Sequence, residues 1–417
     1  MTRYKLGDIA DFNKRTLNKA DSIKEIVYLD TSSITENVIS DTVTLNVADA
    51  PSRAQRKVQH YTIIYSTVRP RLKHYGILKN PNSNLIVSTG FVTIDIKEKY
   101  KGCIDPRYLY LLLTQPSITE YIGNIADTAV SAYPSINPSD ISALSFNFPE
   151  FHIQNRIADV WENYDQKIAL NHAINDNLEA MAKQLYDYWF VQFDFPNGEG
   201  KPYKSSGGKM VWNEKLKREI PEGWHADNIC KIANILSGGT PSKQVDSYWQ
   251  NGNIPFFGPT DYAGSIFQIE TAEYITEEGL NHCASSLFEE GIVIITARGS
   301  IGKLVIIGEP MAMNQSCYAF RSRKNEYEYL YFLTMQLIEH LKAKGSGSVF
   351  KSIITSDIEA SNLLIADEGT ISLFTEKIRP LMNAIRENTK QIRVLIKQRD
   401  ELLPLLMNGQ VSPLNSD

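Results

Sequence analysis

Long hydrophobic runs are missing from this sequence. No stretch approaches the roughly 18 apolar residues that a membrane-spanning helix needs, and the opening segment, MTRYKLGDIADF, lacks the apolar core of a signal peptide. The four cysteines fit no Cys-x-x-Cys spacing, and the seven histidines are scattered without metal-ligand spacing. The sequence therefore predicts a cytoplasmic protein without membrane association, a disulfide framework or a metal site.

Signatures of common enzyme classes are also missing. The stretch Gly299–Lys303 resembles a phosphate-binding loop, but Ala297 stands where the first glycine belongs and Leu304 where Ser or Thr is required. No Asn/Asp-Pro-Pro-Tyr/Phe stretch is present for methylation of an exocyclic amine, and no HExxH, GxSxG or Rossmann glycine pattern occurs. We therefore expect no catalytic residue and no bound cofactor in this chain.

Acidic residues are absent from two stretches, although the net charge of the chain is −5. Residues 51–79 carry seven Lys or Arg and no acid, and residues 341–351 carry three lysines and no acid. Clustered basic residues attract the phosphates of nucleic acid more than a net charge does. The pattern favours a nucleic-acid partner, and the competing interpretation is that both runs are merely solvated faces.

An internal repeat runs through the chain. The run QHYTIIYSTVRPRLK (59–73) matches EEGIVIITARGSIGK (289–303), which places Arg69 opposite Arg298. The match extends to three further pairs of segments: 6–10 with 229–233, 108–113 with 329–333, and 139–141 with 356–358. Because the repeated unit is too long for a solenoid, the duplication predicts two related globular domains.

Each repeat ends in a long segment with apolar residues at alternating steps of three and four. These segments cover about 152–190 and 371–407, and such a seam is typical of a coiled coil. In the first segment the seam is expected to include Tyr164, Ile174, Met181 and Tyr188. The residues expected to pair the two helices are Asn171, Leu178, Leu185, Ile385, Asn388, Leu395 and Leu402.

Asn171 and Asn388 occupy equivalent seam positions, where a buried amide can fix the register of paired helices. The competing interpretation is two unrelated amphipathic helices, each packed on its own domain. A segment rich in Gly, Lys and Pro, residues 197–223, follows the first helix and is expected to be a surface connector.

The expected fold class is mixed α/β, with two similar α/β domains separated by two long helices that form an antiparallel coiled coil. A pseudo-twofold internal repeat relates the halves. The expected boundaries are 1–150 for the first domain, 151–222 for the first helical region and connector, 223–367 for the second domain, and 368–417 for the second helical region and C-terminal tail.

Candidate DNA contacts follow from side-chain chemistry. Arginine can donate two hydrogen bonds to guanine, while hydroxyl and amide side chains reach base edges or phosphates. Loops rich in Gly and Ser, such as SGGTPSK (237–243), GSGSVFKS (345–352) and AVSAYPS (129–135), offer further donors. The candidate residues are Arg53, Arg56, Lys57, Ser66, Arg69, Arg71, Lys73, Ser131, Tyr133, Thr240, Ser242, Lys243, Arg298, Ser300, Lys303, Lys344, Ser346, Ser348 and Lys351.

The motifs resemble those of the specificity (S) subunits of type I restriction-modification enzymes. The resemblance is carried by LGDIADF, ICKIANILSGGTPSK, IVIITARGSIGKLVII, MNQSCYAF, YDYWFVQFDFPN, EIPEGW and LLPLLMNGQV, and it covers nearly the whole chain. The first repeat departs from the pattern, because NKRT follows Phe12 where GGTPS would stand and Val68-Arg69-Pro70 replaces Arg-Gly-Ser.

The resemblance implies two target-recognition domains, each reading half of a bipartite site on double-stranded DNA. It also implies that the helices set the spacing and dock two methyltransferase (modification) subunits, with restriction/translocase subunits as further partners. S-adenosylmethionine, ATP and Mg²⁺ are then expected in those partners only.

Three alternatives stay open at this point. The chain could serve a methylation-only or type IIB-like system, which the neighbouring genes would decide. A fused nuclease-methyltransferase is disfavoured by the missing motifs. A bivalent scaffold without DNA readout is disfavoured by the twin acid-free stretches.

Overall fold

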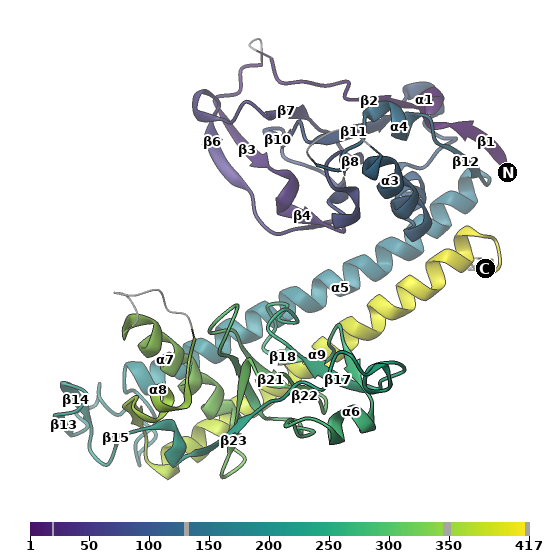
Figure 1. Cartoon of the computed structure of the whole chain (residues 1–417). Helices are drawn as coiled ribbons and strands as arrows, with labels where there is room; N and C mark the ends of the chain where they lie inside the picture. Colours follow the sequence, from purple (N-terminus) through teal and green to yellow (C-terminus); the bar gives the residue numbers. More distant parts are fainter. Residues whose placement is uncertain (19–20, 129–132, 345–351, 413–417) are drawn as a thin grey trace. The chain divides into compact units, whose positions relative to one another are not determined.

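The computed structural model of the chain describes residues 1–18, 21–128, 133–344 and 352–412 (Figure 1). Contacts divide the chain into two compact units, the first of residues 1–166 with 396–417 and the second of residues 167–395. Each unit takes in part of both long helices. The four-part division expected from the sequence therefore stays a prediction, and each unit is described by itself.

The first unit contains two four-stranded sheets. One has the antiparallel order β2 (Ala10–Phe12), β11 (Phe91–Ile96), β8 (Thr62–Ser66), β9 (Tyr75–Leu78). The other has the order β6 (Val43–Asn46), β3 (Glu25–Leu29), β10 (Leu85–Ser88), β7 (Ala54–Lys57). Strands β8 and β9 are buried along their whole length, which explains their unbroken apolar and β-branched sequence.

Short helices complete the first unit. α2 (Pro106–Leu113) and α3 (Pro116–Asp127) pack through buried apolar side chains that join the same core as β8 and β9. Asp105 caps α2, because its carboxylate accepts a hydrogen bond from the backbone N–H of Arg107 at 2.8 Å. The unit is completed by β1 (Thr2–Lys5), which pairs with β12 (Ser145–Phe148), and by α1 (Leu6–Ile9), α4 (Pro138–Ser142) and the hairpin β4 (Ile34–Thr35) and β5 (Val38–Ile39).

The second unit repeats this plan. Its larger sheet has the order β16 (Ala233–Ser237), β23 (Cys317–Ser322), β20 (Val293–Thr296), β21 (Leu304–Ile307), β18 (Phe267–Gln268). Its smaller sheet has the order β19 (Tyr274–Ile275), β17 (Ile254–Phe257), β22 (Ala312–Met313). Further elements of this unit are β15 (His225–Asp227), which pairs with β24 (Leu363–Ile365), and α6 (Glu277–Asn281), α7 (Tyr327–Lys344) and α8 (Thr355–Glu359).

The strand orders of the two units correspond. β2-β11-β8-β9 in the first unit matches β16-β23-β20-β21 in the second. In the smaller sheets, β3 pairs parallel with β10 and antiparallel with β6, and β17 does the same with β22 and β19. The duplication found in the sequence therefore recurs in the topology, with β7 and β18 as additions of one unit each.

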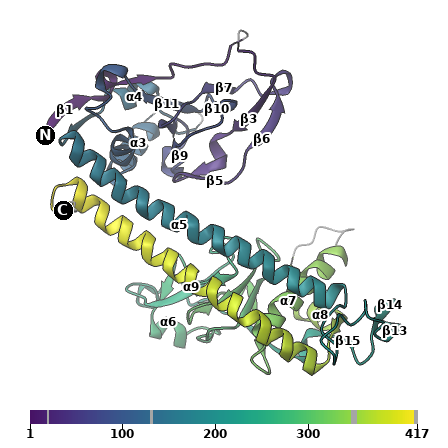
Figure 2. The same ribbon diagram turned by 180° about the vertical axis from the view of Figure 1, so that it is seen from behind.

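The two long helices are α5 (Phe151–Tyr186), which continues into a π-helical turn (Asp187–Val191), and α9 (Glu368–Met407) (Figure 2). In the second unit Asn175 of α5 hydrogen-bonds Asn388 of α9, while in the π-helical turn that continues α5 the ring of Trp189 lies 5.6 Å from that of Phe374 of α9. Rising residue numbers in α5 thus meet falling numbers in α9. Within this unit the two helices run antiparallel.

The contact seam of α5 differs from the expected one. Asn388 Nδ2 donates to Asn175 Oδ1 at 3.1 Å, so the buried amide on α5 is Asn175 and not Asn171. Ile174 and Met181 are 38% and 53% exposed, and Tyr188 is exposed as well. Leu178 and Leu185, which were expected in the seam, are partly buried and pack against the core of the second unit. The other two buried positions are Asn175 and Ala182, one residue after the expected Ile174 and Met181, and hydrophobicity alone does not mark such small or polar residues.

Residues 197–223, which were expected to be a surface connector, contain regular secondary structure. Strands β13 (Met210–Asn213) and β14 (Arg218–Pro221) form a hairpin within this segment. Phe195 stacks on Tyr203 at 4.6 Å and on Trp224 at 5.0 Å between ring centroids. Aromatic packing of this kind holds the connector against the second unit.

Candidate nucleic-acid interface

In the second unit, the loop that follows β20 is organised by a buried hydroxyl. The Thr296 hydroxyl donates to the carbonyl of Ser300 and accepts from the backbone N–H of Lys303. Gly299 and Gly302 take positive φ values of 75° and 78°, which glycine adopts without strain. The turn that results leaves the candidate residues Arg298 and Ser300 exposed at its tip.

A neighbouring turn, Asn314–Ser316, joins this loop to the Gly-Gly-Thr loop. The backbone N–H groups of Ala297 and Arg298 donate to the carbonyl of Ser316 at 2.7 and 3.2 Å. On the other side, the Thr240 hydroxyl donates to the Gln315 side chain. We call the three segments 238–243, 297–303 and 314–316 the second reading cluster.

Close packing in the second reading cluster depends on glycine. A Cβ atom on Gly238 would lie 2.3 Å from the carbonyl oxygen of Asn314, and one on Gly239 would lie 2.6 Å from the backbone nitrogen of Ala284. The turn 314–316 was not among the residues predicted to bind DNA, although it lies within the motif MNQSCYAF. Its amide and hydroxyl residues between two strands were the available signal.

Two candidate lysines of this cluster lie over aromatic rings. Lys303 Nζ is 4.8 Å from the ring centroid of Tyr262, and Lys243 Nζ is 3.5 Å from that of Trp249. Lys243 also forms an ion pair with Glu273, so part of its charge is already compensated. Ser242 is exposed, and its hydroxyl accepts from the backbone N–H of Gln244 at 3.3 Å.

Four candidates lie in or directly before the Gly/Ser-rich stretch of the second unit, residues 345–352. Lys344 is the last residue of α7. Ser346, Ser348 and Lys351 lie outside the described residues. Where the described chain resumes, the backbone N–H of Ile353 donates to the carbonyl of Ala297 at 2.9 Å. This bond ties the end of the stretch to the loop that carries Arg298.

The first unit has the corresponding bond, because the backbone N–H of Ile136 donates to the carbonyl of Thr67 at 2.9 Å. The backbone N–H of Arg69 also donates to the carbonyl of Pro134, and its guanidinium lies 4.9 Å from the ring centroid of Tyr133. Arg69 is exposed with a left-handed φ of 48°. The candidate Ser131 lies outside the described residues.

The structure does not support the prediction that Ser66 contacts DNA. Its side chain is 1% exposed, and its hydroxyl donates to the carbonyl of Val68 at 2.9 Å. The hydroxyl therefore organises the loop, as Thr296 does in the second unit, and Ser66 is not exposed for contact with DNA. A Ser or Thr at the end of a buried strand turns back to its own loop because an unpaired hydroxyl is costly in the core.

The acid-free stretch of the sequence is not acid-free in space. Ion pairs join Lys57 to Asp21 at 2.6 Å, Arg71 to Glu120 at 3.0 Å, Lys73 to Glu36 at 2.6 Å, and Lys79 to Glu162 at 2.9 Å. The charges of these four side chains, which the sequence places in a stretch without acids, are therefore compensated by acids from other parts of the first unit. Among the described residues, no ion pair compensates the other basic members of the stretch, Arg53, Arg56 and Arg69.

The pKa values of the charged groups in the first unit reflect whether each group has an ion-pair partner. The hydrogen bond from Lys57 is the main cause that holds the pKa of Asp21 below its usual value, so both charges persist at neutral pH. Burial lowers the pKa of the Arg56 guanidinium, whose Nε has no hydrogen-bond partner among the described atoms. Arg56 is therefore a half-buried cation whose Nε–H group has no described acceptor, whereas Arg53 and Arg69 are exposed.

Metal sites and membrane-spanning helices are two other features that would bear on function. Within the described ranges, no group of three His, Cys, Asp or Glu side chains is placed to hold a metal ion. No helix in the described part of the chain is long and apolar enough to cross a membrane. The four cysteines are free thiols.

Comparison with known proteins gives the family. The model of the type I restriction modification DNA specificity domain matches residues 1–180 and 221–366. The HindI type I restriction enzyme specificity subunit of Haemophilus influenzae is 24% identical over 98% of this chain and 99% of its own length. The MjaIX specificity subunit of Methanocaldococcus jannaschii is 28% identical over 84% of this chain and 77% of its own length.

Among solved structures, the S subunit of a type I restriction-modification system from M. genitalium aligns with 97% of this chain and 95% of its own. Its TM-score is 0.57 at 15% sequence identity, which supports the fold. The family model covers most of the sequence and matches it in two stretches, one in each half. The chain therefore belongs to the family of type I restriction-modification specificity subunits.

Proposed function

We propose that this chain is the non-catalytic DNA sequence-recognition subunit of a type I restriction-modification complex. Each domain reads one half of a bipartite site on double-stranded DNA. The observation that carries this proposal is the duplicated loop: the same strand of the same topology presents an exposed arginine, Arg69 in one unit and Arg298 in the other.

The chemistry of the second reading cluster suits DNA. Arg298 can donate two hydrogen bonds to guanine in the major groove, and the Gln315 amide is of the kind that pairs with adenine. Thr240 and Ser300 offer hydroxyls of the kind that hold phosphates and so fix the orientation of a duplex. Among the basic residues of the stretch 51–79, Arg53 and Arg69 are the exposed ones for which the described residues provide no ion-pair partner.

We assign α5 and α9 the role of a spacer that fixes the distance between half-sites, paired as an antiparallel coiled coil under a pseudo-twofold repeat. The amide pair Asn175–Asn388 supports this role, because a buried amide contact penalises a slipped register. Asn175 also donates to the Thr389 hydroxyl at 3.2 Å, so both of its polar atoms are used.

Docking of two methyltransferase subunits is assigned to the free side of the same helices. Leu170, Ile174 and Met181 are 60%, 38% and 53% exposed, and their spacing of four and seven residues places them on one stripe of α5. An apolar stripe on a helix that already has a buried side is typical of an interaction surface. S-adenosylmethionine, ATP and Mg²⁺ would be bound by these partners and by restriction/translocase subunits.

Domain exchange tests the reading role. Residues 224–367 are replaced by the equivalent region of a related specificity subunit, and the methylated sites of the host genome are mapped. We expect one half of the recognised sequence to change and the other to persist. A change of both halves, or methylation that ignores the exchange, would contradict the assignment of one domain to one half-site.

A matched insertion tests the spacer. Seven residues are added to α5 between Gln166 and Lys167 and seven to α9 between Leu395 and Ile396, where the two compact units divide. Two added turns lengthen a helix by about 10 Å, which corresponds to about three base pairs. Methylation mapping should show unchanged half-sites with a longer spacer, and an unchanged spacer would limit the helices to docking.

A further inference from the structure

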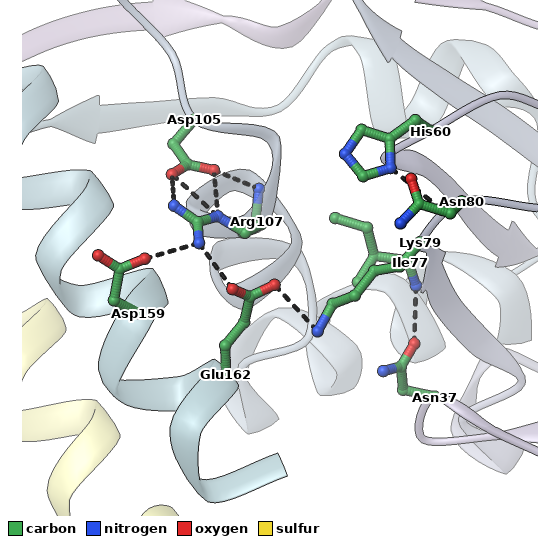
Figure 3. Close-up of polar contacts among 9 residues, drawn as sticks. All are labelled: Asn37, His60, Ile77, Lys79, Asn80, Asp105, Arg107, Asp159 and Glu162. Carbon is green, nitrogen blue, oxygen red and sulfur yellow. Dashed lines mark hydrogen bonds and ion pairs between the residues drawn. The ribbon is translucent and has the colours of Figure 1, made fainter. Parts of the chain in front are cut away.

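In each unit an ion pair joins the helix that follows the main sheet to a long helix: α2 to α5 in the first unit and α7 to α9 in the second. In the first unit, Arg107 of α2 contacts Asp159 Oδ1 at 2.7 Å and Glu162 Oε2 at 2.8 Å, both on α5 (Figure 3). The side chains of Arg107 and Glu162 are only 12% and 15% exposed. Limited solvent makes such a pair stronger than one on an open surface.

Two more charges complete this contact. Asp105 accepts from Arg107 Nη2 at 2.7 Å, and Lys79 Nζ lies 2.9 Å from Glu162. Burial alone would lower the pKa of Arg107, but the hydrogen bonds to Asp105, Asp159 and Glu162 raise it above its usual value. Arg107 is therefore a permanent cation held between its own domain and the long helix.

The backbone that carries Lys79 is itself fixed. The N–H of Asn80 donates to His60 Nδ1 at 3.1 Å, and the N–H of Ile77 donates to Asn37 Oδ1 at 2.9 Å (Figure 3). These bonds fix the backbone at the end of β9, on both sides of Lys79, where this lysine meets the long helix. The contact between domain and helix is thus ordered on both sides.

In the second unit the charges are exchanged. Glu328 of α7 is fully buried at 0% exposure, and its Oε1 lies 2.6 Å from Nε of Arg379 on α9. Arg379 Nη2 also contacts Glu328 Oε2 at 3.3 Å and the carbonyl of Asn325 at 3.0 Å. The hydrogen bond to Glu328 is the main cause that raises the pKa of Arg379.

The four residues occupy equivalent places. Arg107 is the second residue of α2, and Glu328 is the second residue of α7. Glu162 and Arg379 each lie eleven positions after the first residue of their long helix. The repeats YLYLLL and YLYFLT directly follow Arg107 and Glu328, so the sequence match gives the same correspondence.

We infer that this reversed ion pair is a positional code: each reading domain docks stably only on its own helix. A domain moved to the other position needs the opposite charge at the place of Arg107 or Glu328. A copy of the second domain in front of α5 would set a buried glutamate against Asp159 and Glu162. Removing a buried carboxylate from its partner and facing it with like charges strongly disfavours docking.

Glu326 shows that few substitutions are needed for a copy of the second domain to dock on α5. Glu326 lies two residues before Glu328, as Asp105 lies two residues before Arg107. A copy of the second domain therefore already carries the acid that holds Arg107 in the first unit. Changing the copied Glu328 to arginine would restore all members of the cluster that α2 supplies.

The first experiment is a charge-exchange cycle in the full chain. Glu328→Arg and Arg379→Glu should each lower the melting temperature of the second unit, by roughly 10 °C, because each leaves a buried charge without its partner. The combined variant, in which the two charges are exchanged, should recover most of that loss. If the double variant loses as much as the two single losses together, the pair is not coupled and the inference fails.

The second experiment places a copy of the second domain at the position of the first. Residues 1–150 are replaced by a second copy of 224–367, with the copy unchanged, carrying Glu328→Arg, or carrying Glu359→Arg as a control with the same change of charge. Glu359 is exposed on α8, so it has no part in docking. Only the copy with Glu328→Arg should resist trypsin and show a cooperative melt.

Equal protease resistance in all three chimeras, or recovery by Glu359→Arg alone, would overturn the code. These readouts measure docking of a domain on its helix and do not depend on the proposed DNA reading. If docking follows the charge but the rescued chimera fails to methylate a site with two identical halves, the proposed function is at fault and the positional code stands.

Discussion

The two domains share one strand order but hold the loops that carry the candidate DNA contacts by different means. In the second unit, glycines let the backbones of Gly238 and Asn314 approach closely, and no charge is involved. In the first unit, Asn13 stands in that region with a φ of 52°, and its side chain accepts from the N–H of Thr93 at 3.0 Å. The same frame thus tolerates a tight backbone junction or a side-chain bridge.

The domains also differ in how their basic residues are compensated. Arg71 of the first unit is clamped by Glu120, Asn124 and Asp127 of α3, whereas Arg298 of the second has no ion pair among the described residues. A run of basic residues in a sequence therefore does not establish a basic surface. What matters is whether acids from elsewhere in the chain reach it.

The largest effect should come from breaking the glycine junction. In Gly238→Val the new side chain would collide with the backbone of Met313 and Asn314, so the second reading cluster must shift. We expect loss of methylation at the bipartite site, because its second half is no longer read, with the first domain still folded. Gly198→Ala is the control, because a Cβ there meets nothing within 4 Å. Unchanged methylation by Gly238→Val would show that the junction is not needed.

Removal of the two loop arginines compares the domains directly. Arg298→Ala and Arg69→Ala should each leave folding intact and weaken specific binding, by about 1–3 kcal/mol of discrimination if the arginine reads guanine. An arginine that only meets phosphate would lower affinity on all sequences alike and reduce the salt dependence. Titration of specific and random duplexes at several salt concentrations distinguishes the two. No change in either variant would make both arginines structural.

Arginines and lysines already held in ion pairs should matter less. Lys73→Ala removes a pair with Glu36 in which both side chains are about half exposed, and such pairs contribute at most about 1 kcal/mol. We expect its effect on DNA affinity to be smaller than that of Arg69→Ala at the same salt. A loss equal to that of Arg69→Ala would mean that DNA displaces Glu36 and that Lys73 is a contact after all.

The smallest expected effect concerns pH. Burial by itself raises the pKa of Glu162, but hydrogen bonds from Lys79 and Arg107 outweigh it and hold the pKa below its usual value. The resulting stabilisation is present above the ordinary glutamate pKa of about 4.3 and is lost as pH falls through the lower folded value. Melting curves between pH 7 and pH 3 should therefore converge for the wild type and Glu162→Gln at the acid end. A constant difference would exclude this role for Glu162.

Much of the architecture could be predicted from the sequence. Buried strands such as Thr62–Ser66 and Val293–Thr296 are short apolar runs with a Ser or Thr at the end, and their repetition makes the duplication visible in the amino-acid order alone. The long helices were also predictable, because a seam with a period near 3.5 is a local property. The expected ends, about 152–190 and 371–407, lie within a few residues of α5 and α9 when the π-helical turn is included.

Details of the helix seam were beyond local reasoning. The expected stripe contained Leu178 and Leu185, which do pack against the core, but it took Ile174 and Met181 because they are apolar, whereas the structure buries Asn175 and Ala182. A shift of one residue rotates a side chain by about 100° around a helix. Which stripe is buried depends on the partner helix, so hydrophobicity along one segment does not decide it.

The sequence by itself determined the duplicated fold, the long helices and the family, because these follow from patterns that adjacent residues carry. Only the tertiary structure decided which charges remain available to a ligand. Lys57 meets Asp21, and Arg107 meets Glu162, across gaps of many residues that no local pattern spans. Ion pairs act through distance in space, and that distance is fixed only when the strands and helices have packed.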